Sequence, residues 1–157
     1  MVDGPGAGVP EAPGAGVPPG AGEADGFCGV GGSIPYRGHT PSEVPEAAFE
    51  ARLLAGAAAV PADVPLVVLS HQPPHGSVVD NAGWGRHAGS VRLRAFLEAR
   101  RPLLCLCGHI HEGVGVEEIA GCRVVNPGPA AHGRCARIVL EGGPAGMAVR
   151  ACETRMG

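Results

Sequence analysis

The stretch Leu103-Leu104-Cys105-Leu106-Cys107-Gly108-His109-Ile110-His111-Glu112 decides how this chain is interpreted. Its first five residues are apolar, as in a strand that is buried on both faces. The apolar run then ends at a glycine and two histidines spaced two positions apart. A hydrophobic core has no need of imidazoles there, and neutral imidazole is a common ligand of divalent metals. The pattern therefore predicts a strand whose end presents metal-ligating side chains.

A second strand of the same kind lies upstream. Residues 64–70 form a run rich in leucine and β-branched residues. Between the two runs, Ser90 is the expected N-cap of a helix that continues through Arg101 and ends before Pro102. A strand, a helix and a strand in this order predict a crossover unit with two parallel strands.

The upstream strand also ends at a histidine, His71. The carboxyl ends of parallel strands lie at one edge of a sheet, where α/β proteins bind their ligands. We therefore expect His71, His109 and His111 to converge. Three imidazoles at coincident strand ends indicate a metal site more strongly than any one of them.

The remaining pattern predicts an α/β fold with a β-rich C-terminal third. Residues 42–59 have helical composition, with two glutamates in the first turn and prolines beyond the end. Glycine- and proline-rich turns separate the short segments that we expect to be strands, which are residues 27–30, 122–126, 136–141 and 147–152. The glycines at 29, 31 and 32 lack the lysine and the following helix of a phosphate-binding loop.

The chain is expected to contain one folded domain after a low-complexity leader. Residues 1–25 repeat Gly-Ala-Gly-Val-Pro twice, and such a composition predicts disorder because it cannot build a core. Residues 26–157 are enough for one core. A net charge of -3 and arginines scattered along the chain argue against a nucleic-acid or membrane footprint. Six cysteines without a C-x-x-C pair, and no signal or spanning segment, predict a reduced cytoplasmic protein.

Three motifs in order resemble the calcineurin-like metallophosphoesterases, especially their small microbial branch with a GHIHE signature. They are Ser70-His71-Gln72-Pro73-Pro74, Gly108-His109-Ile110-His111-Glu112 and Asn126-Pro127-Gly128. The resemblance implies a partial αββα sandwich and a phosphoester hydrolase with two divalent metals, drawn from manganese, iron, zinc and magnesium. It makes His71 and His109 ligands of one metal, and His111 a ligand of the other.

The resemblance also assigns residues on the loop after His71. Asp80, Arg86 and His87 would rim the pocket on the substrate side, and His87 is the candidate for a catalytic group. Asn126 would shape its turn and take no part in the chemistry. A phosphoester is thus the expected substrate, although nothing in these residues selects monoesters, diesters, cyclic nucleotides or pyrophosphates.

The family's carboxylate motifs D-x-H, G-D-x-x-D and G-N-H are absent from this sequence. Two divalent cations repel each other strongly when no anion lies between them, so a complete two-metal site is not expected from this chain alone. We expect the C-terminal half of an enzyme, inactive or weak by itself and completed by a separately encoded N-terminal half.

Other interpretations stay open. The chain could be a non-catalytic relative that binds a phosphate ligand or a partner through the loop from Asp80 to His87. It could hold one zinc ion on His71, His109 and His111, or a structural zinc that includes Cys105 and Cys107. It could also be a plain α/β domain with incidental histidines. Metal-independent ligand binding would favour the non-catalytic relative, and stoichiometric zinc would favour either of the two zinc sites.

Overall fold

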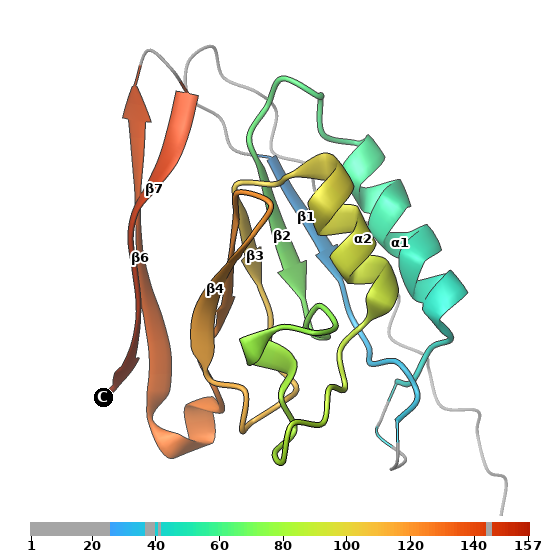
Figure 1. The fold of residues 1–157 in the computed structure, drawn as a ribbon. Coiled ribbons are helices and arrows are strands. Elements are labelled where there is room, and N and C mark those ends of the chain that lie inside the picture. Colours follow the sequence, from blue (N-terminus) through green and yellow to red (C-terminus); the bar gives the residue numbers. More distant parts are fainter. Residues whose placement is uncertain (1–25, 37–39, 41, 144–145) are drawn as a thin grey trace, which may run out of the picture.

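The fold is a three-layer arrangement of helices, a central sheet and a hairpin (Figure 1). The structure is a computed structural model and describes residues 26–36, 40, 42–143 and 146–157. The disorder expected for residues 1–25 falls outside the described residues. Within the described part, no helix is long and apolar enough to cross a membrane.

The central sheet of the described residues has five strands in the order β1-β2-β3-β5-β4. Their bounds are Gly26–Val30 for β1, Leu66–Ser70 for β2, Leu104–Leu106 for β3, Gly115–Ile119 for β4 and Cys122–Asn126 for β5. The pairs β1-β2, β2-β3 and β3-β5 are parallel, and β4 is antiparallel to β5. The crossover predicted between residues 64–70 and 103–107 is therefore confirmed.

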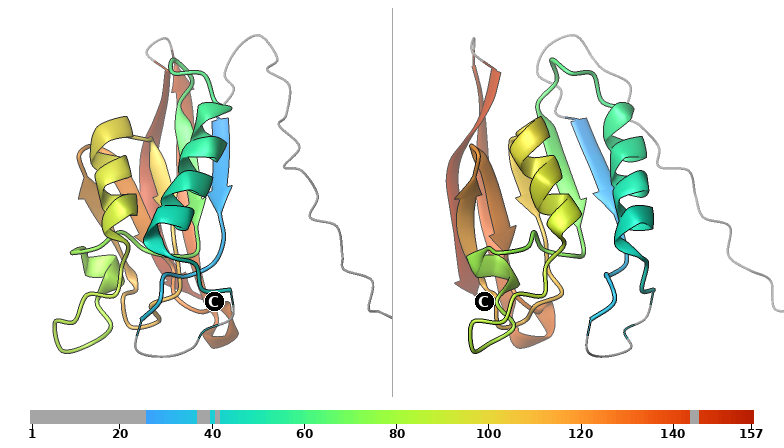
Figure 2. Two further views of the ribbon diagram at one scale, coloured as in Figure 1. Left: turned by 90° about the vertical axis from the view of Figure 1, so that its right-hand side faces the viewer. Right: turned by 45° about the vertical axis from the view of Figure 1, so that its right-hand side comes forward.

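Two helices cover one face of this sheet (Figure 2). Helix α1 spans Glu46–Ala58 and helix α2 spans Val91–Arg100. The Ser90 hydroxyl oxygen accepts a hydrogen bond from the Leu93 N–H at 3.0 Å, which confirms the predicted N-cap. Ser90 also donates its hydroxyl hydrogen to Glu46, at 2.7 Å, and thereby links the first turns of the two helices.

The apolar core lies between the helices and the sheet. Strand residues alternate between the two faces, so one side of each strand meets the helices. Phe49, Leu53, Leu93 and Leu97 are completely buried there against Val68, Cys105 and Val124 of the strands. Four of the six cysteines, Cys28, Cys105, Cys107 and Cys122, act as small core residues, as the sequence predicted for most of them.

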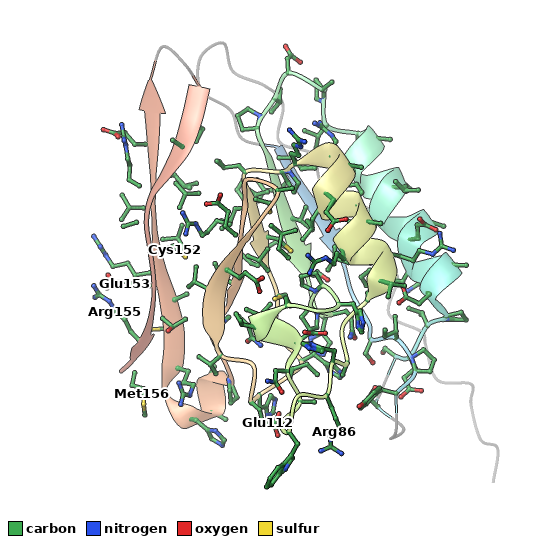
Figure 3. All side chains as sticks on the ribbon, in the orientation of Figure 1. Arg86, Glu112, Cys152, Glu153, Arg155 and Met156 are labelled. Atoms are coloured by element: carbon green, nitrogen blue, oxygen red, sulfur yellow. The ribbon has the colours of Figure 1, made fainter. Side chains whose placement is uncertain are left out.

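A separate hairpin covers part of the opposite face of the sheet. Strands β6 (Arg134–Gly143) and β7 (Gly146–Met156) pair antiparallel with each other. Ala136, Ile138, Val149 and Cys152 pack against Val67, Leu104 and Val125 of the sheet. Glu153 and Arg155 point away from it, as Figure 3 shows. The two sheets and one helix layer correspond to the expected partial sandwich.

Strand β4 was not predicted from the sequence. Its residues Gly-Val-Glu-Glu-Ile include two adjacent glutamates, which weaken a strand signal based on hydrophobicity. The strand forms because Ala120 and Gly121, both with positive φ, make a tight turn that folds it back on β5. It is an edge strand, where charged residues are common because they discourage pairing with other chains.

Candidate functional site

The candidate site lies where β2 and β3 end. His71 follows β2 directly, and its N–H donates to the Val30 carbonyl at the end of β1, at 3.2 Å. The Gly108 N–H donates in turn to the His71 carbonyl, also at 3.2 Å. The ends of three neighbouring strands are thus joined by backbone hydrogen bonds, which fix the histidine-bearing segments relative to one another.

A tight turn presents His109. The Ile110 N–H donates to the Gly108 carbonyl at 2.8 Å, and His109, between them, has a φ of 66°. This left-handed conformation costs a residue with a side chain about 1–2 kcal/mol. Such strain is retained where the surrounding structure imposes it, commonly at functional sites.

The turn brings His109 against His71. Nε2 of His71 and Nδ1 of His109 are 3.1 Å apart, and the ring centroids are 4.9 Å apart with the planes at 64°. Burial lowers the pKa of His109, and the imidazoles of His71 and His111 lower it further, while Glu43 acts in the opposite direction. A lowered pKa favours neutral imidazole, which is the form that binds metals.

The histidines by themselves do not make a complete metal site. Among the described residues, no group of three or more histidine, cysteine, aspartate or glutamate side chains is arranged to hold an ion. His111 is exposed, although it is near enough to influence His109. The zinc site considered on His71, His109 and His111 is therefore not formed within the described chain.

The structural zinc site considered at Cys105 and Cys107 is not formed either. Both cysteines are buried, and burial raises the pKa of the Cys107 thiol to about 12. Metal binding needs the thiolate, which this environment disfavours. These residues fill the core beneath the sheet.

The loop after β2 is built around Asp80. Its carboxylate is completely buried and accepts hydrogen bonds from the N–H groups of Gly76, Ser77 and Gly89 at 2.9–3.1 Å. It also lies 2.6 Å from Nδ1 of His87. The carboxylate thus connects residues from both ends of its own loop. The assignment of Asp80 to the substrate side stays a prediction.

Arg86 and His87 lie on the exposed part of the same loop. Arg86 donates through Nε to the Gly83 carbonyl at 3.4 Å, and in the described part of the chain its guanidinium forms no ion pair. Figure 3 shows Arg86 and Glu112 at the same end of the molecule. Arg86 and His87 are both exposed on the loop, and their roles in substrate binding stay predictions.

Asn126 connects the loop after β2 with the turn after β3 that carries His109. Its buried amide group donates to the Ile110 carbonyl at 2.7 Å and to the Val79 carbonyl at 3.2 Å. Its oxygen accepts from the Gly128 N–H at 3.0 Å, which is the turn-shaping role that the sequence suggested. The bridge between the loops was missed, because no sequence pattern reveals which carbonyls an asparagine will meet.

Glu43 was also missed as a neighbour of the site. It precedes α1, and its carboxylate accepts from the Thr40 N–H at 2.8 Å. Its influence on the pKa of His109 places a negative charge within electrostatic reach of the imidazoles. Only the fold brings it there, since 66 positions separate it from His109.

A groove runs from His71 along the hairpin side of the sheet. It has a volume of about 630 Å³. Its lining combines apolar side chains of the sheet and the hairpin with the strand ends, and includes Leu69, His71, Leu106, Gly108, Ala136 and Ile138. The candidate site therefore opens onto an apolar groove at one end.

Comparisons with known proteins agree with this architecture. Residues 28–144 match the family described as metallophosphoesterase, calcineurin superfamily. An uncharacterized protein of Methanocaldococcus jannaschii, MJ1162, is 31% identical over 110 residues, which are 68% of this chain and 49% of that one. The chain thus spans about half the length of this relative.

Two solved structures share the fold. One crystal structure superposes with a TM-score of 0.61 at 22% identity, over 83% of this chain and 48% of the other. The crystal structure of TT1561 of Thermus thermophilus has a TM-score of 0.53 at 24% identity, over 83% of this chain and 52% of the other. Both are likewise about twice as long as the part that this chain covers.

Proposed function

Because the chain belongs to the calcineurin superfamily of metallophosphoesterases, we propose that it takes part in hydrolysing phosphoester bonds and contributes imidazole ligands for divalent metals. Membership of the superfamily supports a phosphoesterase-like function, and this superfamily generally uses divalent metals. The observation that carries the proposal is the 3.1 Å contact between the ring nitrogens of His71 and His109 at adjacent strand ends.

In this proposal, His71 and His109 serve one metal and His111 the other. The donor set has the imidazoles that manganese, iron or zinc accept, but among the described residues no carboxylate joins them in a group of three that could hold an ion. The described residues therefore do not fit a complete two-metal centre, and no catalytic step is assigned to a metal here. The contribution of this chain is to hold the imidazoles in place.

The loop around Asp80 would face the phosphoester. Asp80 accepts hydrogen bonds on both of its oxygens, so it acts by positioning the loop. Because Nδ1 of His87 lies at Asp80, the other ring nitrogen is left for a contact outside the loop. His87 and the guanidinium of Arg86 are the groups that we propose to meet phosphoryl oxygens.

A second candidate function is phosphate binding without catalysis. The absence of a described metal-holding group of three ligands favours it, since the loop from residue 76 to residue 89 is well formed without any ion. In that case Arg86 and His87 would bind the phosphate group by charge and hydrogen bonding alone. Binding would then be independent of divalent metal.

Manganese titration separates the two candidates. We would measure Mn²⁺ binding by calorimetry, and binding of p-nitrophenyl phosphate with and without Mn²⁺, for the wild type and for the His71→Ala and His109→Ala variants. His132→Ala is the control, because His132 is exposed on the turn before β6. The proposed function expects weak Mn²⁺ binding that both site variants lose and the control keeps.

Two results would count against the proposed function. One is Mn²⁺ binding by His71→Ala and His109→Ala that equals the wild type. The other is phosphate-ester binding that is unchanged by removal of all divalent metal, which would favour the binding module.

We further propose that the protein works in the cytoplasm. The six cysteines are all free, and four of them are buried in the core as thiols. Free thiols are typical of a reducing compartment. Localisation of a tagged full chain would check this.

A further inference from the structure

The loop after β2 ends in an exposed tip that carries an aromatic side chain. Trp84 is the only tryptophan of the chain, and 96% of its surface is exposed. The aromatic pairs of the described residues join His71 with His109 and His75 with His87, so they leave the indole ring unpaired. One exposed side chain by itself indicates nothing, and the construction of the tip decides its meaning.

Hydrogen bonds between nearby residues close the tip into a tight turn. The Ala82 N–H donates to the Arg86 carbonyl at 2.8 Å, and the Arg86 N–H donates to the Gly83 carbonyl at 3.1 Å. The side-chain oxygen of Asn81 accepts from the Gly83 N–H at 2.9 Å. The tip is therefore an ordered turn, and Trp84 stands at its apex.

The apex has a left-handed backbone at consecutive residues. The angle φ is 84° at Gly83, 57° at Trp84 and 69° at Gly85. A Cβ atom added at either glycine would meet no atom within 4 Å, so the conformation and not the space selects glycine there. Tryptophan lacks that freedom, and its bulky side chain makes a positive φ unfavourable. Strain of this kind is concentrated at sites that bind ligands.

The buried carboxylate of Asp80 holds this turn beside the candidate site. Asp80 precedes the turn and contacts His87 at its end, at 2.6 Å. Trp84 follows Asp80 by four positions, so their Cα atoms are at most about 14 Å apart. Figure 1 shows the same loop next to the turn between β3 and β4, to which Asn126 connects it. The tip is thus part of the rim of the site.

The residues that follow Trp84 suit a phosphate group. Arg86 is exposed and forms no ion pair in the described part of the chain. His87 contacts Asp80 through Nδ1, which leaves Nε2 for another partner. A guanidinium and an imidazole can both donate hydrogen bonds to phosphoryl oxygens. The turn therefore presents a planar apolar ring next to groups that bind an anion.

The small apolar area at the tip indicates a small planar ligand. Both chain neighbours of Trp84 are glycines, and Val78 is the other large hydrophobic side chain that is mainly exposed on the described loop. A stable protein interface needs a much wider contact. A membrane-binding surface needs several apolar side chains with basic residues around them. One nucleobase needs only one ring to stack on.

We propose that Trp84 is the stacking platform for the base of a nucleotide whose phosphate meets Arg86 and His87. The assignment rests on the proposed function for its phosphate part and on the construction of the tip for its base part. The indole selects esters that carry an aromatic group over esters that do not. It tolerates different bases, because every base has a planar face.

The test titrates the metal-free full chain with adenosine 5′-monophosphate, ribose 5-phosphate and adenosine. Fluorescence reports on the base directly, because Trp84 is the only tryptophan, and calorimetry gives each affinity. The variants are Trp84→Ala and Trp84→Phe. Phe27→Ala is the matched control, since Phe27 is an aromatic residue with 61% of its surface exposed. It lies at the start of β1, at the end of the sheet opposite the site.

The expected result is saturable quenching by adenosine 5′-monophosphate and none by ribose 5-phosphate. Stacking on one aromatic side chain should make the nucleotide bind roughly 5–150-fold more tightly than the sugar phosphate. Trp84→Ala should bind the two alike, whereas Trp84→Phe should keep part of the preference. Phe27→Ala should match the wild type.

Equal affinity of the wild type for the nucleotide and the sugar phosphate would overturn the stacking proposal and leave the proposed function standing. An undiminished preference in Trp84→Ala would overturn it too. So would a fluorescence change with vesicles of phosphatidylcholine and phosphatidylglycerol but none with the nucleotide, which would make a lipid surface the ligand. Adenosine that binds as tightly as the nucleotide would instead keep the base platform and count against the phosphate contacts of the proposed function.

Discussion

Replacing Asp80 by asparagine tests whether one buried carboxylate organises the loop beside the site. The change keeps the shape of the side chain and replaces one acceptor oxygen by an NH₂ donor. One oxygen accepts from the Gly76 and Gly89 N–H groups, and the other from the Ser77 N–H and hydroxyl and from His87. Either orientation of the amide therefore places its NH₂ group against at least one backbone N–H donor, and against two where it replaces the oxygen that accepts from Gly76 and Gly89.

The expected loss follows from these contacts. A hydrogen bond to a charged group contributes about 1.5–3 kcal/mol, so the one backbone bond lost in the less costly orientation reduces the free energy of unfolding by about 1.5–3 kcal/mol. With a urea dependence of about 1–3 kcal/mol per molar, the midpoint of unfolding should fall by roughly 0.5–3 M. That is a large share of the roughly 5–15 kcal/mol that stabilises a typical domain.

Urea unfolding followed by circular dichroism measures this loss, and Trp84 reports on the loop. Trp84 is the only tryptophan of the chain and lies on this loop with 96% of its surface exposed. Its fluorescence anisotropy should decrease in Asp80→Asn because the loop is no longer held. Asp63→Asn is the control, since Asp63 is exposed and has no hydrogen bond or ion pair among the interactions described. A stability loss below about 1 kcal/mol, equal to that of the control, would refute the reasoning.

Three further predictions concern the turn, the helix cap and the thiols. In thermal unfolding without metal, the His109→Gly variant should be more stable than the His111→Gly variant by about 1 kcal/mol, because of these two positions only 109 has a positive φ. Equal stabilities of the two variants would contradict the backbone strain inferred at His109. Ser90→Ala should lower the free energy of unfolding by about 1–2 kcal/mol, since it removes the cap of α2 and the bond to Glu46, and an unchanged urea midpoint would exclude that role. Iodoacetamide at pH 8 should modify Cys135 within minutes and leave Cys107 unmodified until the chain unfolds. The reason is that Cys135 is exposed, whereas burial raises the pKa of the Cys107 thiol to about 12. Equal labelling of the two cysteines in mass spectrometry would contradict this prediction.

Local patterns were enough to identify most of the fold. The leucine- and valine-rich runs that end at His71 and Gly108 were predicted as buried parallel strands, and both were found with the helix between them. The Ser90 cap was also visible in the sequence, because a cap depends on only a few consecutive residues. Strand β4 was missed because its pairing with β5 depends on a turn and outweighs its charged composition.

The candidate site was predictable only in outline. The positions of His71 and His109 at strand ends follow from strand order, and the family assignment follows from their motifs. The substrate-side assignment of Asp80 stays a prediction, but the structure adds what no pattern indicated, namely that its carboxylate is completely buried and accepts hydrogen bonds from its own loop. The roles of Asn126 and Glu43 depend on contacts between segments far apart in the chain, which no local pattern encodes.

The sequence by itself determined the order of the helices and of the strands other than β4, and the imidazoles that follow β2 and β3, because hydrophobic periodicity and capping are properties of neighbouring residues. The tertiary structure decided that His71 and His109 touch, that Asp80 and Asn126 hold the surrounding loops, and that Phe27 and Leu69 stay exposed while Val67 is covered by the hairpin. These features depend on distances across the sheet, and such distances are fixed only when the whole chain packs.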